Sequence, residues 1–273
     1  QGRVQATMRL AADGDAVLLV IHRQLLATLI GQLSGFVLRA DVHFEDSSSR
    51  IALAGLLHAE PDRHWSSAAA AASGVTMMVA SPRRILLAGA PAALEKVLAQ
   101  VERGDEVDWQ RLSIADGEPL IQPESAALWL PQMLNLDLLG AVSFSKGCYV
   151  GQEIVARAQH LGRIKRRMLR FVGPPGAALE PGHALFSGDA LAAQVVTAIG
   201  DPDSTQCLAV AELRFCGDLL GARPGGTEFV PADLPEQPID INELLAQRES
   251  AAIHNGDIER RRDNRAHGAA KTA

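Results

Sequence analysis

The chain has 273 residues, of which 47% are hydrophobic, so it is long enough to bury one large core or two moderate ones. Its formal net charge of -6 gives no general attraction to nucleic acid or to an anionic membrane surface. No apolar run approaches membrane-spanning length and no signal peptide is visible. Composition therefore indicates a globular protein, for which we expect neither direct nucleic-acid binding nor membrane binding.

The chain contains three cysteines, Cys148, Cys207 and Cys216, and none of them forms a CxxC pair. This spacing argues against a disulfide framework and against a cluster site built from cysteines alone. The eight histidines are scattered without HExxH spacing, so we expect no metal site made by the protein. A reducing compartment fits best, and we expect the protein in the cytoplasm.

Periodicity in the first half of the chain alternates between strand and helix patterns. Asp13, Gly14 and Asp15 predict a hairpin turn, and Gly35 and Gly104 follow the ends of two runs with helical spacing. The predicted elements are strands at 2–10, 16–21, 37–44 and 51–57 and helices at 25–33 and 91–101. The fold class predicted for this half is α+β.

The second half changes to short β runs separated by Gly and Pro, at 168–172, 184–186, 195–199 and 208–213. Such a pattern is typical of a small β-barrel. We expect a first domain at 1–165, a barrel domain at 166–235 and a charged, disordered tail at 236–273. Because Gln1 begins inside a predicted strand, we also expect a further N-terminal segment.

Eight consecutive residues combine a thiol, a cation, glycines and hydrogen-bonding side chains. They are Lys146, Gly147, Cys148, Tyr149, Val150, Gly151, Gln152 and Glu153. Apolar residues after them predict a helix that begins near Tyr149 or Val150, with Cys148 at its positive end beside Lys146, a setting that favours thiolate. The alternative is a tight turn in which the cysteine is small, buried and structural.

The pattern K-G-C-Y-x-G-Q-E resembles the signature of the YgfZ family, folate-binding relatives of the glycine-cleavage T-protein that support iron–sulfur enzymes. The run Pro131–Leu136 and the segment 140–144 also resemble family sequence upstream of the cysteine. The resemblance covers about residues 1–235 and is most specific between Pro131 and Arg166.

The resemblance implies a folate-binding domain of the aminomethyltransferase type followed by a small C-terminal β-barrel. It implies an accessory factor for assembly or repair of iron–sulfur proteins, including tRNA-modifying enzymes, rather than a classical turnover enzyme. Tetrahydrofolate would be the cofactor, and iron–sulfur client proteins would be the partners. Cys148 would be the functional thiol, stabilised by Lys146. The residues that would contact folate are Asp116, Gln132, Asn135, Arg157 and Lys165.

Two departures from related sequences affect what the resemblance implies. One-carbon transferases of this fold carry an aspartate on the strand that corresponds to residues 2–8, where this chain has Gln5, Ala6 and Thr7. Relatives also read E-A-G-x-P where this chain reads Ala115-Asp116-Gly117-Glu118-Pro119, so the carboxylate expected to hold the pterin is displaced or lost.

Two other functions remain open from the sequence. A folate-dependent aminomethyl or methyl transferase of the T-protein type would need proton handling that the missing aspartate would supply. A ligand-free interaction domain with a structural Cys148 would show neither folate binding nor thiol reactivity.

Overall fold

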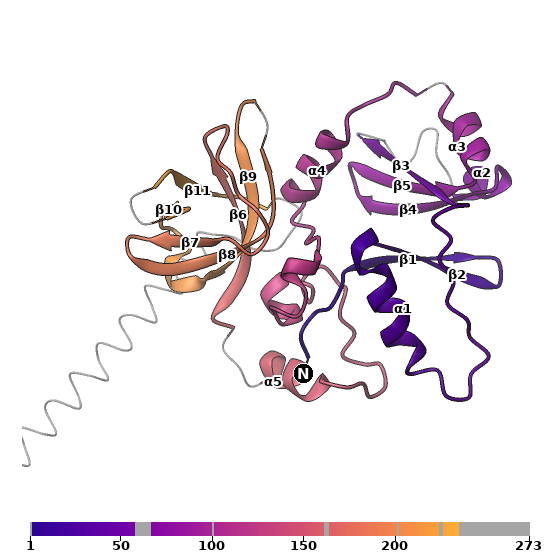
Figure 1. The fold of residues 1–273 in the computed structure, drawn as a ribbon, viewed down its shortest axis with the longest axis horizontal. Coiled ribbons are helices and arrows are strands. Elements are labelled where there is room, and N and C mark those ends of the chain that lie inside the picture. Colours follow the sequence, from indigo (N-terminus) through magenta and orange to yellow (C-terminus); the bar gives the residue numbers. More distant parts are fainter. Residues whose placement is uncertain are drawn as a thin grey trace, which may run out of the picture.

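The computed structural model describes residues 2–57, 67–99, 101–160, 164–200, 202–223 and 226–234. Figure 1 shows two lobes, with a barrel on one side and two small sheets with their helices on the other. The expected tail at 236–273 and residue Gln1 lie outside the described residues. Within the described part, no helix combines the length and the apolar character needed to cross a bilayer.

The chain begins with an antiparallel hairpin formed by β1 (Met8–Asp13) and β2 (Ala16–Ile21), joined through Gly14 at φ +60°. The predicted turn is confirmed, but the first strand begins at Met8 rather than at residue 2. The preceding residues bond elsewhere: Val4 exchanges two backbone hydrogen bonds with Trp129 and Ala127, and the Thr7 hydroxyl donates to the Pro119 carbonyl.

The elements that follow confirm the predicted order with one exception. A short turn η1 (Arg23–Leu25) leads into α1 (Leu26–Ser34), which ends at Gly35. The strand predicted at 37–44 is wrong, because this stretch forms an irregular loop in which Leu38 is 88% exposed. Its alternating residues have no sheet to pack against, and alternation alone does not make a strand.

A three-stranded antiparallel sheet follows in the order β3-β5-β4. Its strands are β3 (Ala52–Leu57), β4 (Val75–Ser81) and β5 (Arg84–Gly89), and its helices are α2 (Ser67–Ala72), α3 (Pro91–Leu98) and α4 (Glu106–Ala115). On one face Ile85 and Leu87 pack with Leu94 of α3. On the other, Met78 and Leu86 meet the β1–β2 hairpin. The helix predicted from Pro91 is confirmed, with proline at its start.

The predicted barrel is confirmed and is closed, in the order β10-β11-β6-β9-β8-β7. Its strands are β6 (Arg166–Gly173), β7 (Ala184–Ser187), β8 (Ala190–Gly200), β9 (Thr205–Glu212), β10 (Leu220–Gly221) and β11 (Glu228–Ala232), and η4 (Leu213–Phe215) follows β9. Closure leaves no free sheet edge among the described strands of this lobe.

Strand β9 is buried on both faces. Cys207 and Ala209 point into the barrel, beside Phe171 and Phe229. The residues that alternate with them, Leu208 and Val210, belong to a second core outside the barrel. This core is completed from the connecting segment by Ile121, Trp129 and Leu134. Successive side chains of β9 therefore pack alternately in the barrel core and in the core that the barrel shares with the connecting segment.

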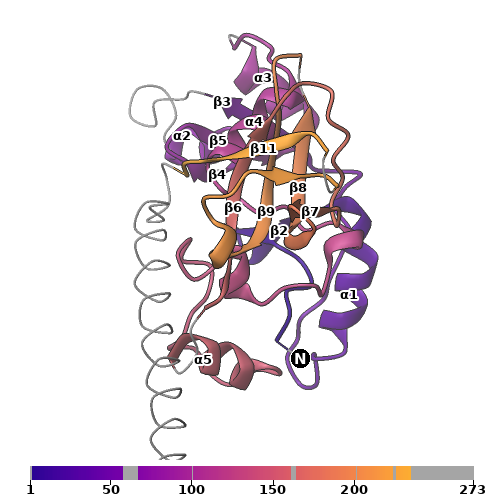
Figure 2. The ribbon, with the colours of Figure 1, turned by 90° about the vertical axis from the view of Figure 1, so that its left-hand side faces the viewer.

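The connecting segment contains η2 (Pro123–Ser125), η3 (Pro131–Leu134) and helix α5 (Gln152–His160). Both ribbon views place α5 beside the N-terminal end of the chain and away from the three-stranded sheet (Figures 1 and 2). Gly2 approaches so closely that a Cβ there would lie 2.8 Å from the Gly151 carbonyl oxygen. Gly2 has φ +72°, so both space and backbone require glycine.

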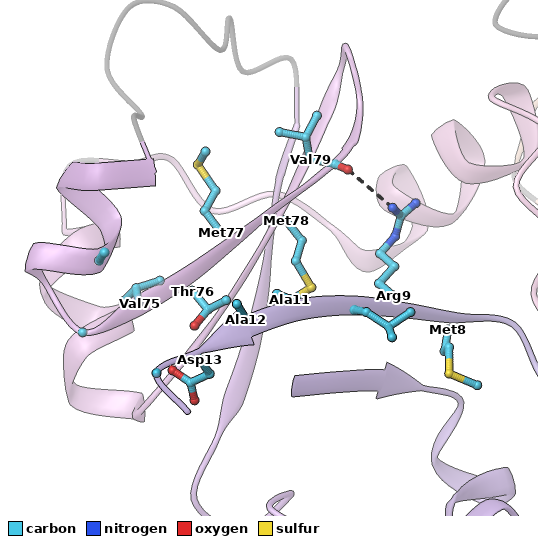
Figure 3. Close-up of a pocket in the computed structure, with 14 residues that line it drawn as sticks. Met8, Arg9, Ala11, Ala12, Asp13, Val75, Thr76, Met77, Met78 and Val79 are labelled. Atoms are coloured by element: carbon cyan, nitrogen blue, oxygen red, sulfur yellow. Dashed lines mark hydrogen bonds between the residues drawn. The ribbon is translucent and has the colours of Figure 1, made fainter. Parts of the chain in front are cut away.

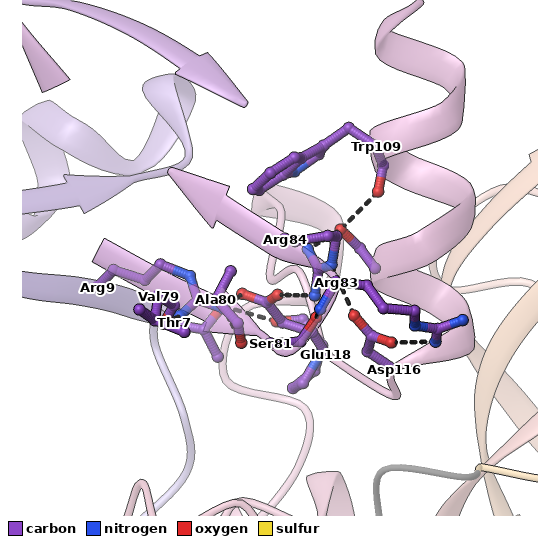
Figure 4. A network of polar contacts seen from close by, with 12 residues as sticks. Thr7, Arg9, Val79, Ala80, Ser81, Arg83, Arg84, Trp109, Asp116 and Glu118 are labelled. Atoms are coloured by element: carbon purple, nitrogen blue, oxygen red, sulfur yellow. Dashed lines mark hydrogen bonds and ion pairs between the residues drawn. The ribbon is translucent and has the colours of Figure 1, made fainter. Parts of the chain in front are cut away.

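A buried network of ion pairs connects the two sheets and α4 within the first lobe (Figure 4). Arg84 on β5 is 1% exposed, and its Nε donates to Asp116 Oδ2 at 2.7 Å while its Nη2 donates to Glu118 Oε2 at 2.7 Å. Its guanidinium also lies 4.9 Å from the ring centroid of Trp109. Arg9 on β1 binds the other Glu118 oxygen at 2.6 Å. Arginines from β1 and β5, which belong to different sheets, therefore share the Glu118 carboxylate.

We predict that Gly55→Ala destabilises the first lobe. A Cβ on Gly55 would lie 2.8 Å from Cζ3 of Trp109 and closer still to Cε3. Displacing a packed indole should lower the free energy of unfolding by about 1–3 kcal/mol, measured by urea denaturation. The matched control is Gly31→Ala on α1, where a Cβ meets nothing within 4 Å and should stabilise the helix by about 0.5–1 kcal/mol. Equal effects of the two substitutions would contradict this packing.

We also predict that the Asp116 network makes stability fall in acid. Burial alone would raise the pKa of Asp116, but hydrogen bonds from Ser81, Arg84 and Arg83 outweigh it and hold that pKa below its usual value. The stabilisation is therefore fully present above the unfolded pKa of about 3.9 and is lost as pH falls through the lower folded pKa.

Asp116→Asn should lower the free energy of unfolding near neutral pH by about 3 kcal/mol, the lower end for a broken buried ion pair, because Glu118 remains beside Arg84. The curves of wild type and variant should converge in acid. Asp189→Asn, which removes an exposed carboxylate from the β7–β8 turn, is the control and should follow wild type. Parallel curves for wild type and Asp116→Asn would refute the predicted linkage.

Candidate functional site

The segment that carries Cys148 is an exposed loop in front of α5. Residues 143–150 are exposed, and Cys148 is a free thiol among them. The Lys146 ammonium lies 4.6 Å from the ring centroid of Tyr149, a cation–π distance. Lys146 and Tyr149 thus contact each other on either side of the cysteine. The alternative of a small buried cysteine is contradicted by this exposure.

A tight turn links this loop to the helix. The backbone N–H of Tyr149 donates to Gln152 Oε1 at 3.1 Å, and the N–H of Gln152 donates to the Tyr149 carbonyl at 3.2 Å. Gly151 has φ +90°, a conformation that glycine adopts without steric cost. Helix α5 begins at Gln152, two or three residues later than predicted, because the turn occupies that space.

Helix α5 is anchored by one buried residue and keeps its polar face exposed. Val155 is 1% exposed, and its carbonyl accepts a hydrogen bond from Gln132 Nε2 at 2.8 Å. Glu153 and Arg157 form an ion pair at 2.7 Å with side chains 81% and 68% exposed. Such a pair contributes only tenths of a kcal/mol to stability.

The two amides predicted as ligand contacts, Gln132 and Asn135, are buried in or just after η3. Gln132 binds the carbonyl of Val155, and Asn135, at φ +58°, donates to the Met168 carbonyl of β6 at 2.7 Å. Gln132 Oε1 has no hydrogen-bond partner among the described residues. The amides therefore connect η3 to α5 and to the barrel, and Gln132 keeps one buried acceptor.

A second ion pair strengthens this connection. Arg167 on β6 donates to both oxygens of Asp137, at 2.7 and 3.0 Å, and to the backbone carbonyl of Gln132 at 2.9 Å. The two side chains are 14% and 5% exposed. Bidentate geometry with an additional carbonyl contact is the arrangement in which a largely buried pair is well satisfied.

The other predicted folate contacts lie apart from these amides. Asp116 is 4% exposed and belongs to the Arg84 network, where Arg83 also donates to it at 2.5 Å. Lys165, at the start of the barrel, is exposed, as is Arg157. The structure thus gathers the loop residues and brings Gln132 to α5, but it leaves Asp116 in a separate cluster.

A groove of about 890 Å³ lies between β1 and β4 (Figure 3). It is lined by Met8, Met77 and Met78 together with Arg9, whose Nη1 approaches the Val79 carbonyl at 3.5 Å. None of the predicted folate contacts lines it. No local sequence pattern predicts this groove or the Arg84 network, although two arginines, Arg83 and Arg84, at the start of an apolar strand are a signal of an unusual buried charge.

No three His, Cys, Asp or Glu side chains within the described ranges lie close enough together to hold a metal ion. The site therefore offers one exposed thiol, neighbouring exposed cations and a buried amide acceptor. Chemically, an exposed thiol can act as a nucleophile, exchange with a disulfide or ligate a soft metal when it is deprotonated.

A comparison with protein-family models finds no match. The chain is 28% identical, over 200 residues, to proteins named tRNA-modifying protein YgfZ from Shigella boydii serotype 18 and Escherichia coli O6:K15:H31. A protein of that name from Escherichia fergusonii is 27% identical over 200 residues. Each alignment covers 68% of this chain and 61% of the relative, so the chain spans less than two thirds of these relatives.

These relatives agree with the signature on the exposed loop: the chain is similar to proteins of the YgfZ family.

Proposed function

We propose that this chain is a folate-binding accessory factor that supports tRNA modification through the assembly or repair of iron–sulfur proteins. The observation that carries the proposal is the exposed Cys148 on the signature loop, together with relatives named for tRNA modification. An accessory factor must present its reactive group to a client protein, and this thiol is accessible from outside. Iron–sulfur client proteins are the partners in this proposal.

The three thiols differ in a way that favours Cys148. Cys207 and Cys216 are both 0% exposed and lie in the barrel core, and burial raises the pKa of Cys207 to about 12. A buried thiol of high pKa carries almost no thiolate at neutral pH. Cys148 alone among them lies on an exposed loop, with the Lys146 ammonium two residues away in sequence.

Reduced folate would combine a hydrogen-bonding pterin with a carboxylate tail. The buried Gln132 Oε1, with no described partner, is suited to accept from a pterin N–H group, and exposed Arg157 and Lys165 are suited to the tail. Asp116 fits less well, because Arg83 and Arg84 already bind its oxygens. In this proposal Gln132 carries the main polar contact to the pterin, and folate would supply a bound one-carbon carrier.

A T-protein transferase remains the alternative. It would need a carboxylate on the segment that leads into β1, where Gln5, Ala6 and Thr7 stand, and the Thr7 hydroxyl is used to hold the Pro119 carbonyl. A ligand-free domain with a structural cysteine is disfavoured by the exposure of Cys148.

We predict that alkylation separates the three thiols. In the native protein iodoacetamide should label Cys148 at least tenfold faster than Cys207 or Cys216, because only the exposed thiol is reachable without unfolding. Peptide mass spectrometry measures each rate, and urea should equalise them. Cys148→Ser should lose the fast phase. Fast native labelling of either barrel cysteine would rule out the assignment.

We predict that reduced folate binds without supporting amine-dependent one-carbon transfer. Folate at one hundred times its dissociation constant should add about 2.7 kcal/mol of apparent stability, measured by thermal or urea unfolding. Glycine-derived or methylated amines should not be turned over, since no carboxylate occupies residues 2–8 to handle the proton.

Matched variants locate the folate contacts. Gln132→Met, which removes the Oε1 acceptor at nearly constant volume, and Arg157→Ala should each weaken binding about tenfold, equivalent to about 1.4 kcal/mol. Arg50→Ala removes an exposed ion pair to Glu45 in the 36–50 loop and should leave the affinity unchanged. Robust amine turnover would favour the transferase, whereas the absence of any folate stabilisation would favour the ligand-free domain.

A further inference from the structure

The N-terminal segment lies against the turn that joins the thiol loop to α5. Both ribbon views place the N-terminal end of the chain beside this helix (Figures 1 and 2). A Cβ on Gly2 would lie 2.8 Å from the Gly151 carbonyl oxygen, well inside van der Waals contact. It would also lie 3.4 Å from Cγ2 of Val155 and 3.5 Å from Cβ of Ile154. Gly2 is therefore packed against both the turn and the first residues of the helix.

The N-terminal segment is fixed on its other side to the connecting segment. The Val4 N–H donates to the Trp129 carbonyl at 2.9 Å, and the Val4 carbonyl accepts from the Ala127 N–H at 2.8 Å. Trp129 is 4% exposed and belongs to the core outside the barrel, against which Val4 packs. Because these contacts involve a buried residue and two backbone hydrogen bonds, residues 2–4 have no room to withdraw from a side chain added at position 2.

The start of α5 is fixed as well, but the loop before it is not. Val155 is 1% exposed, and its carbonyl accepts from Gln132 Nε2 at 2.8 Å. Residues 143–150, in contrast, are exposed. The part of the chain that yields to a side chain at position 2 is therefore the Gly151 peptide and the loop in front of it, which contains Cys148.

We infer that Gly2 is a positioning residue for the Cys148 thiol. Because Gly2 has no side chain, the Gly151 carbonyl packs directly against its backbone, and the two glycines have φ values of +72° and +90°. Two hydrogen bonds between Tyr149 and Gln152 then transmit the position of Gly151 to the residue that follows Cys148. The inference rests on the proposed function of Cys148 and adds to it a residue that is distant in sequence.

The test compares Gly2→Ala with Gly176→Ala in the barrel lobe. Gly176 has φ +75°, so alanine meets a similar backbone conformation there, but its Cβ would have nothing within 4 Å. Tyr149 is the only tyrosine in the sequence, so ring-labelled tyrosine gives one set of NMR signals, which comes from the thiol loop. Gly2→Ala should shift these signals because the turn is displaced, whereas Gly176→Ala should leave them at their wild-type positions.

Thiol reactivity is the second readout of the same two variants. The rate at which iodoacetamide labels Cys148 in the native protein should change by about threefold or more in Gly2→Ala, because the loop that presents the thiol has moved. Gly176→Ala should be labelled at the wild-type rate. Equal rates in wild type and both variants, or unshifted Tyr149 signals in Gly2→Ala, would overturn the inference.

A measurement on the wild type decides the matter if Gly2→Ala fails to fold. The Hα protons of Gly2 should show a nuclear Overhauser effect to a methyl group of Val155, since Cγ2 of Val155 lies 3.4 Å from the place of a Cβ on Gly2. Absence of this effect would refute the contact. The ranking of the three thiols, which tests the proposed function, is measured separately, so rapid labelling of a barrel cysteine would refute that function and leave the Gly2 contact intact.

Discussion

The burial of Arg84 is the constraint on which the first lobe depends. A guanidinium with 1% exposure is tolerable only when its charge and its donors are all satisfied, and here Asp116, Glu118, Ser113 and the face of Trp109 surround it. These partners come from α4 and from the segment after it. The network therefore fixes α4 against the three-stranded sheet and, through Arg9, brings in the hairpin.

Placement of the exposed thiol follows from a second set of contacts that is mostly polar. The η3 turn binds α5 through Gln132 and binds β6 through Asn135 and the Asp137–Arg167 pair. Strand β6 belongs to the closed barrel. The η3 turn therefore attaches α5, the helix that follows Cys148, to the barrel. Among residues 152–159 of α5, whose burial the structure describes, only Val155 is fully buried, which leaves most of this surface available to a partner.

The elements that the sequence predicts best are those whose residue pattern depends on a local physical cause, such as side-chain burial or the backbone geometry of proline. The barrel strands and the helix at Pro91 follow from burial periodicity and from proline at a helix start, and the structure has both. The strand predicted at 37–44 failed because strand formation depends on a neighbouring edge, which is non-local. Helix α5 starts later than predicted because Gly151 and Gln152 form a turn first.

The candidate site was predictable to a different degree for each kind of residue. The loop around Cys148 is contiguous, so eight letters define it, and its exposure agrees with a presented thiol. Contacts such as Arg84 to Asp116 join residues 32 positions apart, and no local pattern reveals that a carboxylate already has two arginine partners. A family resemblance indicates which position of the sequence corresponds to a ligand contact, but not which charged groups surround that residue in the fold. Asp116 was therefore predicted as a ligand contact, whereas the structure shows it in a network that stabilises the fold.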